Sequence, residues 1–309
     1  MNVMKLSAIL LSAVMVLSLT ACADRNPLNP GSSSSVPSKP NTSSVPEPSE
    51  PDVSAVPEPS ESQNSTPVTM NVDFGKINAK DTKRYDWGPG GPKDDNGRPV
   101  SAVTYNQKFG EYNALFVKED SQKVYLTFDE GYDNGNTEPI LNTLKEKNVK
   151  GLFFLTGGFV KAAPNLVQRM VDEGHMVGNH TWGHPTMPET GNEKCYETVE
   201  KLHTFILEQY GVEMKTFRFP AGAYNEQNLE MMRQMGYRSV FWSFAYKDWL
   251  VDAQPEPEAA LTKILDAAHP GAVYLLHSVS KTNAQILGRV IDGLQEKGYT
   301  IGDPADLLN

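Results

Sequence analysis

The stretch Lys123-Val-Tyr-Leu-Thr-Phe-Asp129-Glu130 is a nearly unbroken apolar run that ends in two acidic residues. A run of this length, rich in β-branched and aromatic side chains, predicts a strand that is buried on both faces. Such strands are typical of parallel sheets that are covered by helices. Neighbouring residues at a strand end point to opposite sides, so Asp129 and Glu130 should have different roles.

Strands and helices alternate along the chain on either side of this stretch. Apolar runs predict further strands at residues 151–156, 175–179, 216–218, 239–243, 272–277 and 299–301. Helical periodicity predicts helices at residues 137–147, 162–173, 193–210, 226–235, 256–268 and 283–297. This alternation indicates a parallel sheet with flanking helices. The number of units favours a closed or nearly closed α/β barrel over a doubly wound sheet.

The N-terminal residues indicate export. Lys5 precedes an apolar run from Leu6 to Leu19, which is short for a membrane span and has the length of a signal-peptide core. The run ends in Leu-Thr-Ala-Cys22, which resembles the lipobox of bacterial lipoproteins. On this interpretation residues 1–21 are removed and Cys22 is lipidated. The alternative is an ordinary secretory signal with Cys22 near the cut by chance.

Residues 22–70 are expected to form a disordered tether. They consist mostly of Ser, Pro and Glu, and the hexapeptide Val-Pro-Glu-Pro-Ser-Glu occurs at 45–50 and again at 56–61. Such a segment has too few apolar side chains to offset its ordering entropy. Residues 71–309 then form one globular domain. A lipid anchor on this tether would hold that domain at the extracellular face of the cell membrane.

The overall charge excludes some partners. The chain has 309 residues and a net charge of -10, which argues against binding to nucleic acid or to anionic lipid by charge alone. Cys195 is the only cysteine besides Cys22, so a lipidated chain could form no internal disulfide. We expect Cys195 to be a buried core residue and the exported domain to be a monomer.

Polar clusters follow the predicted strands. They are Asp129-Glu130, His180-Thr-Trp-Gly-His184, Arg218-Phe-Pro-Ala-Gly222, Lys247-Asp248-Trp249 and His277. Active sites of parallel α/β barrels assemble at this carboxyl end of the strands. A spacing of four on a helical or tight-turn segment puts His180 and His184 on one side, as one metal ion requires. Two hydrogen-bonded loop histidines are the alternative, but an acid pair at another strand end favours a metal site.

These clusters resemble, in order, the five motifs of the NodB-like polysaccharide deacetylases. The motifs are Thr127-Phe-Asp-Glu-Gly131, His180-Thr-Trp-Gly-His-Pro185, Arg218-Phe-Pro-Ala-Gly222, Asp248-Trp249 and Leu275-Leu-His277. Residues 125–135, 174–180, 240–249 and 269–284 are closer still to the δ-lactam-biosynthetic branch. That branch removes the N-acetyl group of muramic acid in spore-cortex peptidoglycan. In a spore former, the resemblance would place the anchored domain on the side of the forespore membrane that faces the cortex. The resemblance implies a distorted seven-stranded (β/α) barrel.

The resemblance also implies catalytic roles. Asp129 would be the general base that activates water, and Arg218 would pair with it and keep it ionised. His277 would be the general acid that protonates the departing amine, and Asp248 would hold it charged. The amide N–H of Tyr224 would help to stabilise the oxyanion.

The implied metal site contains His180 and His184 as ligands of one divalent ion, which we expect to be zinc. Glu130 is the third candidate ligand, although members of the family usually have Asp there. Because Glu is one methylene longer, it can ligate only if the strand end retreats or the metal shifts. Whether Glu130 binds the metal is therefore left open by the sequence.

Other functions remain possible on the sequence alone. The substrate could be N-acetylglucosamine, a chitooligosaccharide or an O-acetyl ester in place of muramic acid. The chain could also be a non-catalytic, wall-binding lipoprotein that keeps the fold. Glu130 is the only support for that last alternative, and the presence of Asp129, Arg218, Asp248 and His277 argues against it.

Overall fold

The computed structural model describes residues 70–309. The predicted signal peptide, the lipidation site Cys22 and nearly all of the predicted tether lie outside these residues. Within residues 70–309, no helix is both long enough and apolar enough to cross a membrane.

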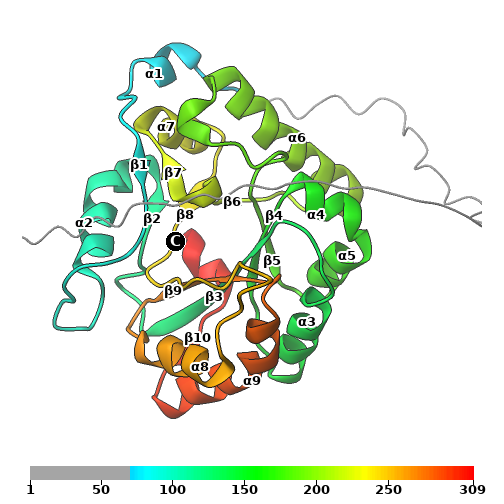
Figure 1. Ribbon diagram of the computed structural model, residues 1–309. Coiled ribbons are helices and arrows are strands. Elements are labelled where there is room, and N and C mark those ends of the chain that lie inside the picture. Colours follow the sequence, from blue (N-terminus) through cyan, green and yellow to red (C-terminus); the bar gives the residue numbers. More distant parts are fainter. Residues whose placement is uncertain (1–69) are drawn as a thin grey trace, which may run out of the picture. The chain divides into compact units, whose positions relative to one another are not determined.

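A curled parallel sheet forms the centre of the described residues, and helices surround it (Figure 1). Its strands are β2 (Ala114–Leu115), β3 (Lys123–Glu130), β4 (Leu152–Leu155), β5 (Met176–Asn179), β6 (Thr216–Phe217), β8 (Arg238–Val240), β9 (Val273–His277) and β10 (Thr300–Ile301). The order is β10-β3-β4-β5-β6-β8-β2, with β9 on β3. A single bridge between Phe244 and Tyr274 links β9 to the segment after β8, which brings the sheet close to a ring.

Apart from α1, which precedes the first strand, the helices lie in the connections between strands. They are α1 (Phe74–Asn78), α2 (Val100–Phe109), α3 (Thr137–Glu146), α4 (Gly157–Ala162), α5 (Pro164–Asp172), α6 (Asn192–Tyr210), α7 (Glu226–Gln234), α8 (Pro257–Asp266) and α9 (Lys281–Glu296). Local signals set several of their ends. Thr156 caps α4 by accepting from the Phe159 N–H, Pro164 begins α5, and Gly211 ends α6 in the left-handed conformation.

All seven predicted strands and all six predicted helices are present, which confirms the predicted barrel-like α/β fold. The structure adds β2, which pairs with β8, and a small antiparallel pair of β1 (Tyr85–Asp86) with β7 (Ala223–Tyr224). It also adds the helices α1, α2 and α4. Cys195 is fully buried in the core, as predicted.

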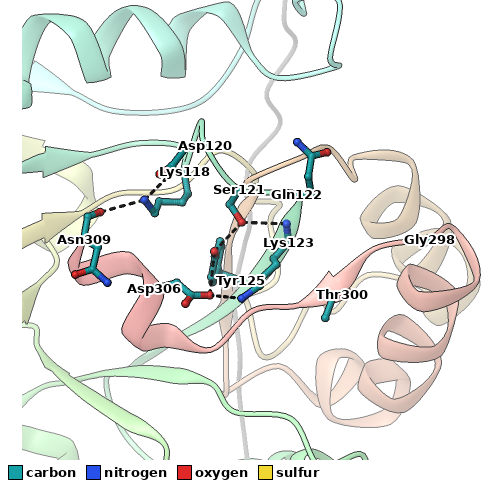
Figure 2. Close-up of a pocket in the computed structure, with 10 residues that line it drawn as sticks. All are labelled: Lys118, Asp120, Ser121, Gln122, Lys123, Tyr125, Gly298, Thr300, Asp306 and Asn309. Carbon is teal, nitrogen blue, oxygen red and sulfur yellow. Dashed lines mark hydrogen bonds and ion pairs between the residues drawn. The ribbon is translucent and has the colours of Figure 1, made fainter.

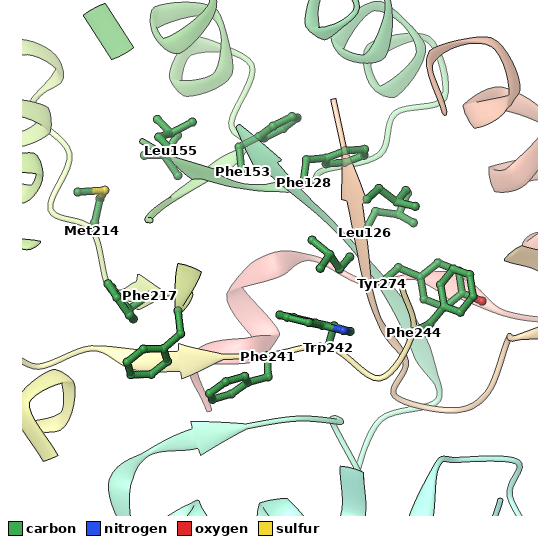
Figure 3. Close-up of a cluster of buried hydrophobic side chains, with 14 of the residues drawn as sticks. Leu126, Phe128, Phe153, Leu155, Met214, Phe217, Phe241, Trp242, Phe244 and Tyr274 are labelled. Carbon is green, nitrogen blue, oxygen red and sulfur yellow. The ribbon is translucent and has the colours of Figure 1, made fainter. Parts of the chain in front are cut away.

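Alternate residues of each strand pack on opposite sides of the sheet. Tyr125 and Phe154 belong to a small cluster inside the curled sheet, which Leu307 from the C-terminal 3-10 turn completes. Leu126, Phe128, Phe153 and Leu155 belong to the larger cluster that includes the apolar side chains of α3 and α9 (Figure 3). Burial of each such side chain contributes about 1.5–3 kcal/mol. The same alternation decides which side chains at the strand ends reach the interior.

Candidate active site

Asp129 lies on the interior side of β3, two residues beyond Thr127 and four beyond Tyr125. Its register partner on the adjacent strand β9 is His277, so the two side chains leave the sheet on the same side. On the other edge, Asp129 is in register with Phe154 of β4. The predicted base and the predicted acid are therefore neighbours at the carboxyl end of the sheet.

Arg218 holds the Asp129 carboxylate in place. The guanidinium is fully buried, and its Nη1 donates to Asp129 Oδ1 at 2.8 Å. Its Nε and Nη2 donate to the carbonyl oxygens of Val240 and Phe241 at 3.0 and 3.1 Å, and it lies 4.1 Å from the centre of the Phe154 ring. Burial alone would raise the pKa of Asp129. The charges of Arg218, His180 and His277, together with the hydrogen bond from Arg218, outweigh burial and hold the pKa below its ordinary value. Asp129 is thus ionised at neutral pH.

His180 presents one free ring nitrogen to the site. Its Nδ1 lies 2.8 Å from the carbonyl oxygen of Arg218. A carbonyl can only accept, so Nδ1 carries the proton and Nε2 keeps its lone pair. That Nε2 lies 3.6 Å from Asp129 Oδ2. Burial lowers the pKa of His180 to about 4, so the ring is neutral, as a metal ligand must be.

His184 lies beside His180, with the two ring centres 4.8 Å apart. The segment between them is a turn and not a helix, because Thr181 and His184 have φ angles of 69° and 52°. The hydroxyl of Thr181 accepts from the His184 N–H at 2.8 Å and stabilises this turn. The predicted pairing of the two imidazoles is therefore present in the structure.

His277 and Asp248 form the second charged pair. Asp248 is fully buried, and its Oδ1 accepts from His277 Nδ1 at 2.7 Å while its Oδ2 accepts from the His277 main-chain N–H at 2.9 Å. Burial alone would lower the pKa of His277, but the hydrogen bond and charge of Asp248 outweigh it and raise the pKa. The Trp249 ring is half exposed and lies 5.6 Å from the His277 ring. His277 is suited to donate a proton.

Glu130 does not lie with His180 and His184. It is on the helix-facing side of β3, where its carboxyl oxygens accept from the hydroxyls of Ser278 and of Thr137, the first residue of α3. Burial raises its pKa to about 8, so it is mostly protonated at neutral pH. The arrangement argues against Glu130 as a metal ligand, because its oxygens are used by two hydroxyls on the far side of the strand. Within residues 70–309, no three His, Cys, Asp or Glu side chains are grouped to hold a metal.

Tyr224 does not join the site either. It is fully buried among aromatic rings and faces Tyr85 in the β1–β7 pair. The Trp87 N–H donates to the carbonyl of Gly222, so ladder alternation makes Tyr85 and Tyr224 the next hydrogen-bonded pair. The Tyr224 amide is thereby used in strand pairing, which argues against its predicted contact with an oxyanion. Ala221, with a φ of 53°, is the exposed residue of this turn and the better candidate for contact with substrate.

A separate polar pocket of about 480 Å³ lies at the other end of β3 (Figure 2). Its charged groups are paired with one another: Lys118 with Asp120 at 2.7 Å, and Lys123 with Asp306 at 2.8 Å. It lies at the amino end of the strand, and none of the candidate catalytic or metal-binding residues lines it. Its charged side chains neutralise one another in ion pairs, so the pocket is not a candidate reaction centre.

Hydrolysis of an amide needs a base that takes a proton from water and an acid that protonates the leaving nitrogen. Both lie at the carboxyl end of this sheet, where their charged partners keep Asp129 ionised and favour protonated His277. The fold and the site therefore define a hydrolytic enzyme of the α/β-barrel class.

Comparison with known proteins narrows this class. The profile of the polysaccharide deacetylase family matches residues 117–240, and the chain belongs to that family. It is 37% identical to the peptidoglycan-N-acetylmuramic acid deacetylase PdaA of Bacillus subtilis, over 68% of this chain and 81% of the relative. The solved structure of that family 4 carbohydrate esterase superposes with a TM-score of 0.69, at 34% identity, over 74% of this chain and 98% of that chain. The peptidoglycan-N-acetylglucosamine deacetylase PgdA of Listeria monocytogenes is 34% identical over 58% of this chain and 37% of its own length.

Proposed function

We propose that this protein removes the N-acetyl group from N-acetylmuramic acid in peptidoglycan, as a step towards the muramic δ-lactam of the spore cortex. The observation that carries the proposal is the register of Asp129 with His277 on adjacent strands, each beside its own charged partner. A wall-binding protein without activity would not need two such charged pairs at one end of the sheet. Similarity to the muramic acid deacetylase over most of its length favours that sugar over N-acetylglucosamine.

The residues divide the reaction between them. Asp129 takes a proton from the attacking water, whose oxygen bonds to the acetyl carbon. His277 gives its Nε2 proton to the nitrogen, the C–N bond breaks, and the products are acetate and the free amine. Arg218 and Asp248 keep these two groups in the required protonation states.

The test of substrate uses peptidoglycan strands with and without stem peptides. We expect acetate release, and mass analysis of the digested glycan should place the free amine on muramic acid. Free amine on glucosamine alone would support the second candidate, an N-acetylglucosamine deacetylase. No acetate from either glycan or from chitooligosaccharide would leave only the non-catalytic function.

We further propose that His180 and His184 hold one divalent ion. We expect zinc, because zinc is commonly bound by imidazoles with a carboxylate nearby, which here is that of Asp129. The free Nε2 of His180 is the structural support for this site. When bound, such an ion would polarise the acetyl carbonyl and favour deprotonation of water.

Elemental analysis of purified protein tests the metal site. The parent should carry one equivalent of metal, and His180→Ala and His184→Ala should lose most of it. Glu130→Gln is the matched control, because it replaces a nearby carboxyl whose contacts are to Ser278 and Thr137. It should keep its metal. Equal metal in the parent and both histidine variants would contradict the site, and metal loss in Glu130→Gln would make Glu130 a ligand.

We also propose that a lipid on Cys22 anchors the protein at the extracellular face of the membrane through a tether of residues 22–70. The sequence Leu19-Thr-Ala-Cys22 after an apolar run supports this. Cys22→Ser should move active enzyme from the membrane to the soluble extracellular fraction without changing its rate on soluble glycan. A variant that stays on the membrane after signal cleavage would contradict lipidation.

A further inference from the structure

The buried Asp248 carboxylate has a third hydrogen-bond donor besides the two from His277. Nδ2 of Asn283, in the first turn of α9, donates to Asp248 Oδ2 at 2.6 Å. The same Nδ2 donates to the carbonyl oxygen of His277 at 3.1 Å. Asn283 therefore contacts both members of the acid pair at once, and it is only 2% exposed.

The chemistry of its neighbours fixes which way the Asn283 amide points. The carboxylate of Asp248 and the carbonyl of His277 can only accept, so the group that faces them must be the NH₂, whose two hydrogens match the two acceptors. On the other side, the hydroxyl of Tyr246 donates to Asn283 Oδ1. Burial raises the pKa of Tyr246, so this hydroxyl keeps its proton. A flipped amide would lose the hydrogen bond that Tyr246 donates to Oδ1 and would put the amide oxygen against two acceptors.

The start of α9 positions Asn283. Ser280 is the N-cap residue, and its Oγ accepts from the Asn283 N–H at 3.1 Å. The same hydroxyl donates to Oε1 of Gln254, whose Nε2 donates to the carbonyl oxygen of Asp248 at 2.9 Å. The helix end and the segment of Asp248 are thereby joined by side chains that are mostly buried. The N-terminal end of α9 also favours a negative charge at Asp248.

We propose that Asn283 is a positioning residue for the general acid, and that Tyr246 locks its amide in the orientation this requires. Asn283 holds the Asp248 carboxylate in line with Nδ1 of His277 and holds the end of β9 against it. The inference rests on the proposed hydrolytic function, but its geometry is independent of which acetylated sugar is bound. It assigns a function to two buried polar residues that the mechanism above does not use.

Other charged groups also act on His277, and the test must separate them from Asn283. Asp129 on β3 favours the charged ring, Arg218 after β6 disfavours it, and His184 lies near enough to interact with it. None of these groups contacts Asn283. A change at Asn283 should therefore reach His277 only through Asp248 and the end of β9.

The experiment compares Asn283→Ala and Tyr246→Phe with Thr282→Val in the purified protein. Thr282 is the matched control, because its buried hydroxyl lies in the same turn of α9 and donates to the carbonyl of Pro255. The pKa of His277 is read by NMR, with His277→Gln assigning its signal among six histidines. Circular dichroism and thermal melting report the fold, and acetate release gives kcat and KM.

In Asn283→Ala, kcat should fall about tenfold or more with KM nearly unchanged, since the acid loses its alignment and not its substrate. The pKa of His277 should fall by about half a unit or more, because the carboxylate no longer stays in line with Nδ1. Tyr246→Phe should change both in the same direction by less, and Thr282→Val should change neither.

A folded Asn283→Ala or Tyr246→Phe protein with the parent's pKa for His277 would overturn the proposal, even if activity were lost. If Asn283→Ala fails to fold, Tyr246→Phe, which removes one hydroxyl, decides alone. If the parent itself releases no acetate, the proposed function fails, while the NMR comparison still tests the positioning of His277.

Discussion

Asp129→Asn should lower kcat for acetate release by about a hundredfold or more, because the variant has no base to take the proton from water. The fold should survive the change. Arg218 keeps its bonds to the carbonyl oxygens of Val240 and Phe241, and the amide oxygen of the substituted side chain can still accept from Nη1. A loss of stability of about 1–3 kcal/mol is expected from the weakened pair.

Initial rates on soluble glycan and chemical denaturation measure the two effects. Glu130→Gln is the matched control for a carboxyl-to-amide change, because it alters the adjacent residue on the opposite side of β3 and can keep its bonds to Ser278 and Thr137. It should retain kcat within a few-fold. Activity near the parent's in Asp129→Asn would exclude Asp129 as the base, and a hundredfold loss in Glu130→Gln would move Glu130 into the site.

The strand-and-helix pattern could be predicted because each long element has a clear period and a local end signal. The sequences of β3 and β9 are apolar over most of their length, since both sides of a covered parallel sheet are buried. The two-residue strands β1, β2 and β7 are too short to show any period. Helix α4 begins with Gly157-Gly158, which disfavours a helix in isolation, and its cap at Thr156 and its packing determine it.

The sequence predicted that polar side chains gather at the carboxyl ends of the strands. It did not predict which groups the Glu130 side chain contacts. The alternation of side chains correctly separates it from Asp129. In a sheet with one open face, a side chain on the side opposite Asp129 would reach solvent or substrate. Here the other side of β3 packs on α3, so the Glu130 carboxyl meets Thr137 and Ser278 instead.

Residues whose function depends on a distant partner left no signal in the sequence. Asn283 is one polar residue among several at the start of a helix, and only the folded chain places it against Asp248, 35 positions away. Tyr224 is the opposite case, a residue that the sequence suggested for the site and that the folded chain places elsewhere. It follows the Pro-Ala-Gly turn at residues 220–222, but its main-chain amide is engaged in strand pairing with Tyr85.

Asp248→Asn should reduce kcat at neutral pH by about a hundredfold, because it weakens the general acid. The argument follows from the hydrogen bonds. Oδ2 of Asp248 has two donors, the His277 N–H and Asn283, so the amide oxygen of the variant should take that position. Its NH₂ then faces Nδ1 of His277, which must become an acceptor. His277 is thereby held neutral, with its proton on Nε2.

The pH profile shows this directly. His277 must be protonated to act, so activity is lost as pH rises through its pKa, and Asp248 raises that pKa in the parent. Without the charge of Asp248 the pKa falls, and the alkaline limb of kcat should move to lower pH. Lys247→Gln is the matched control, since it changes an exposed charge next in sequence and should leave the limb in place. A limb at the parent's pH in Asp248→Asn would mean that His277 does not depend on Asp248 for its charge.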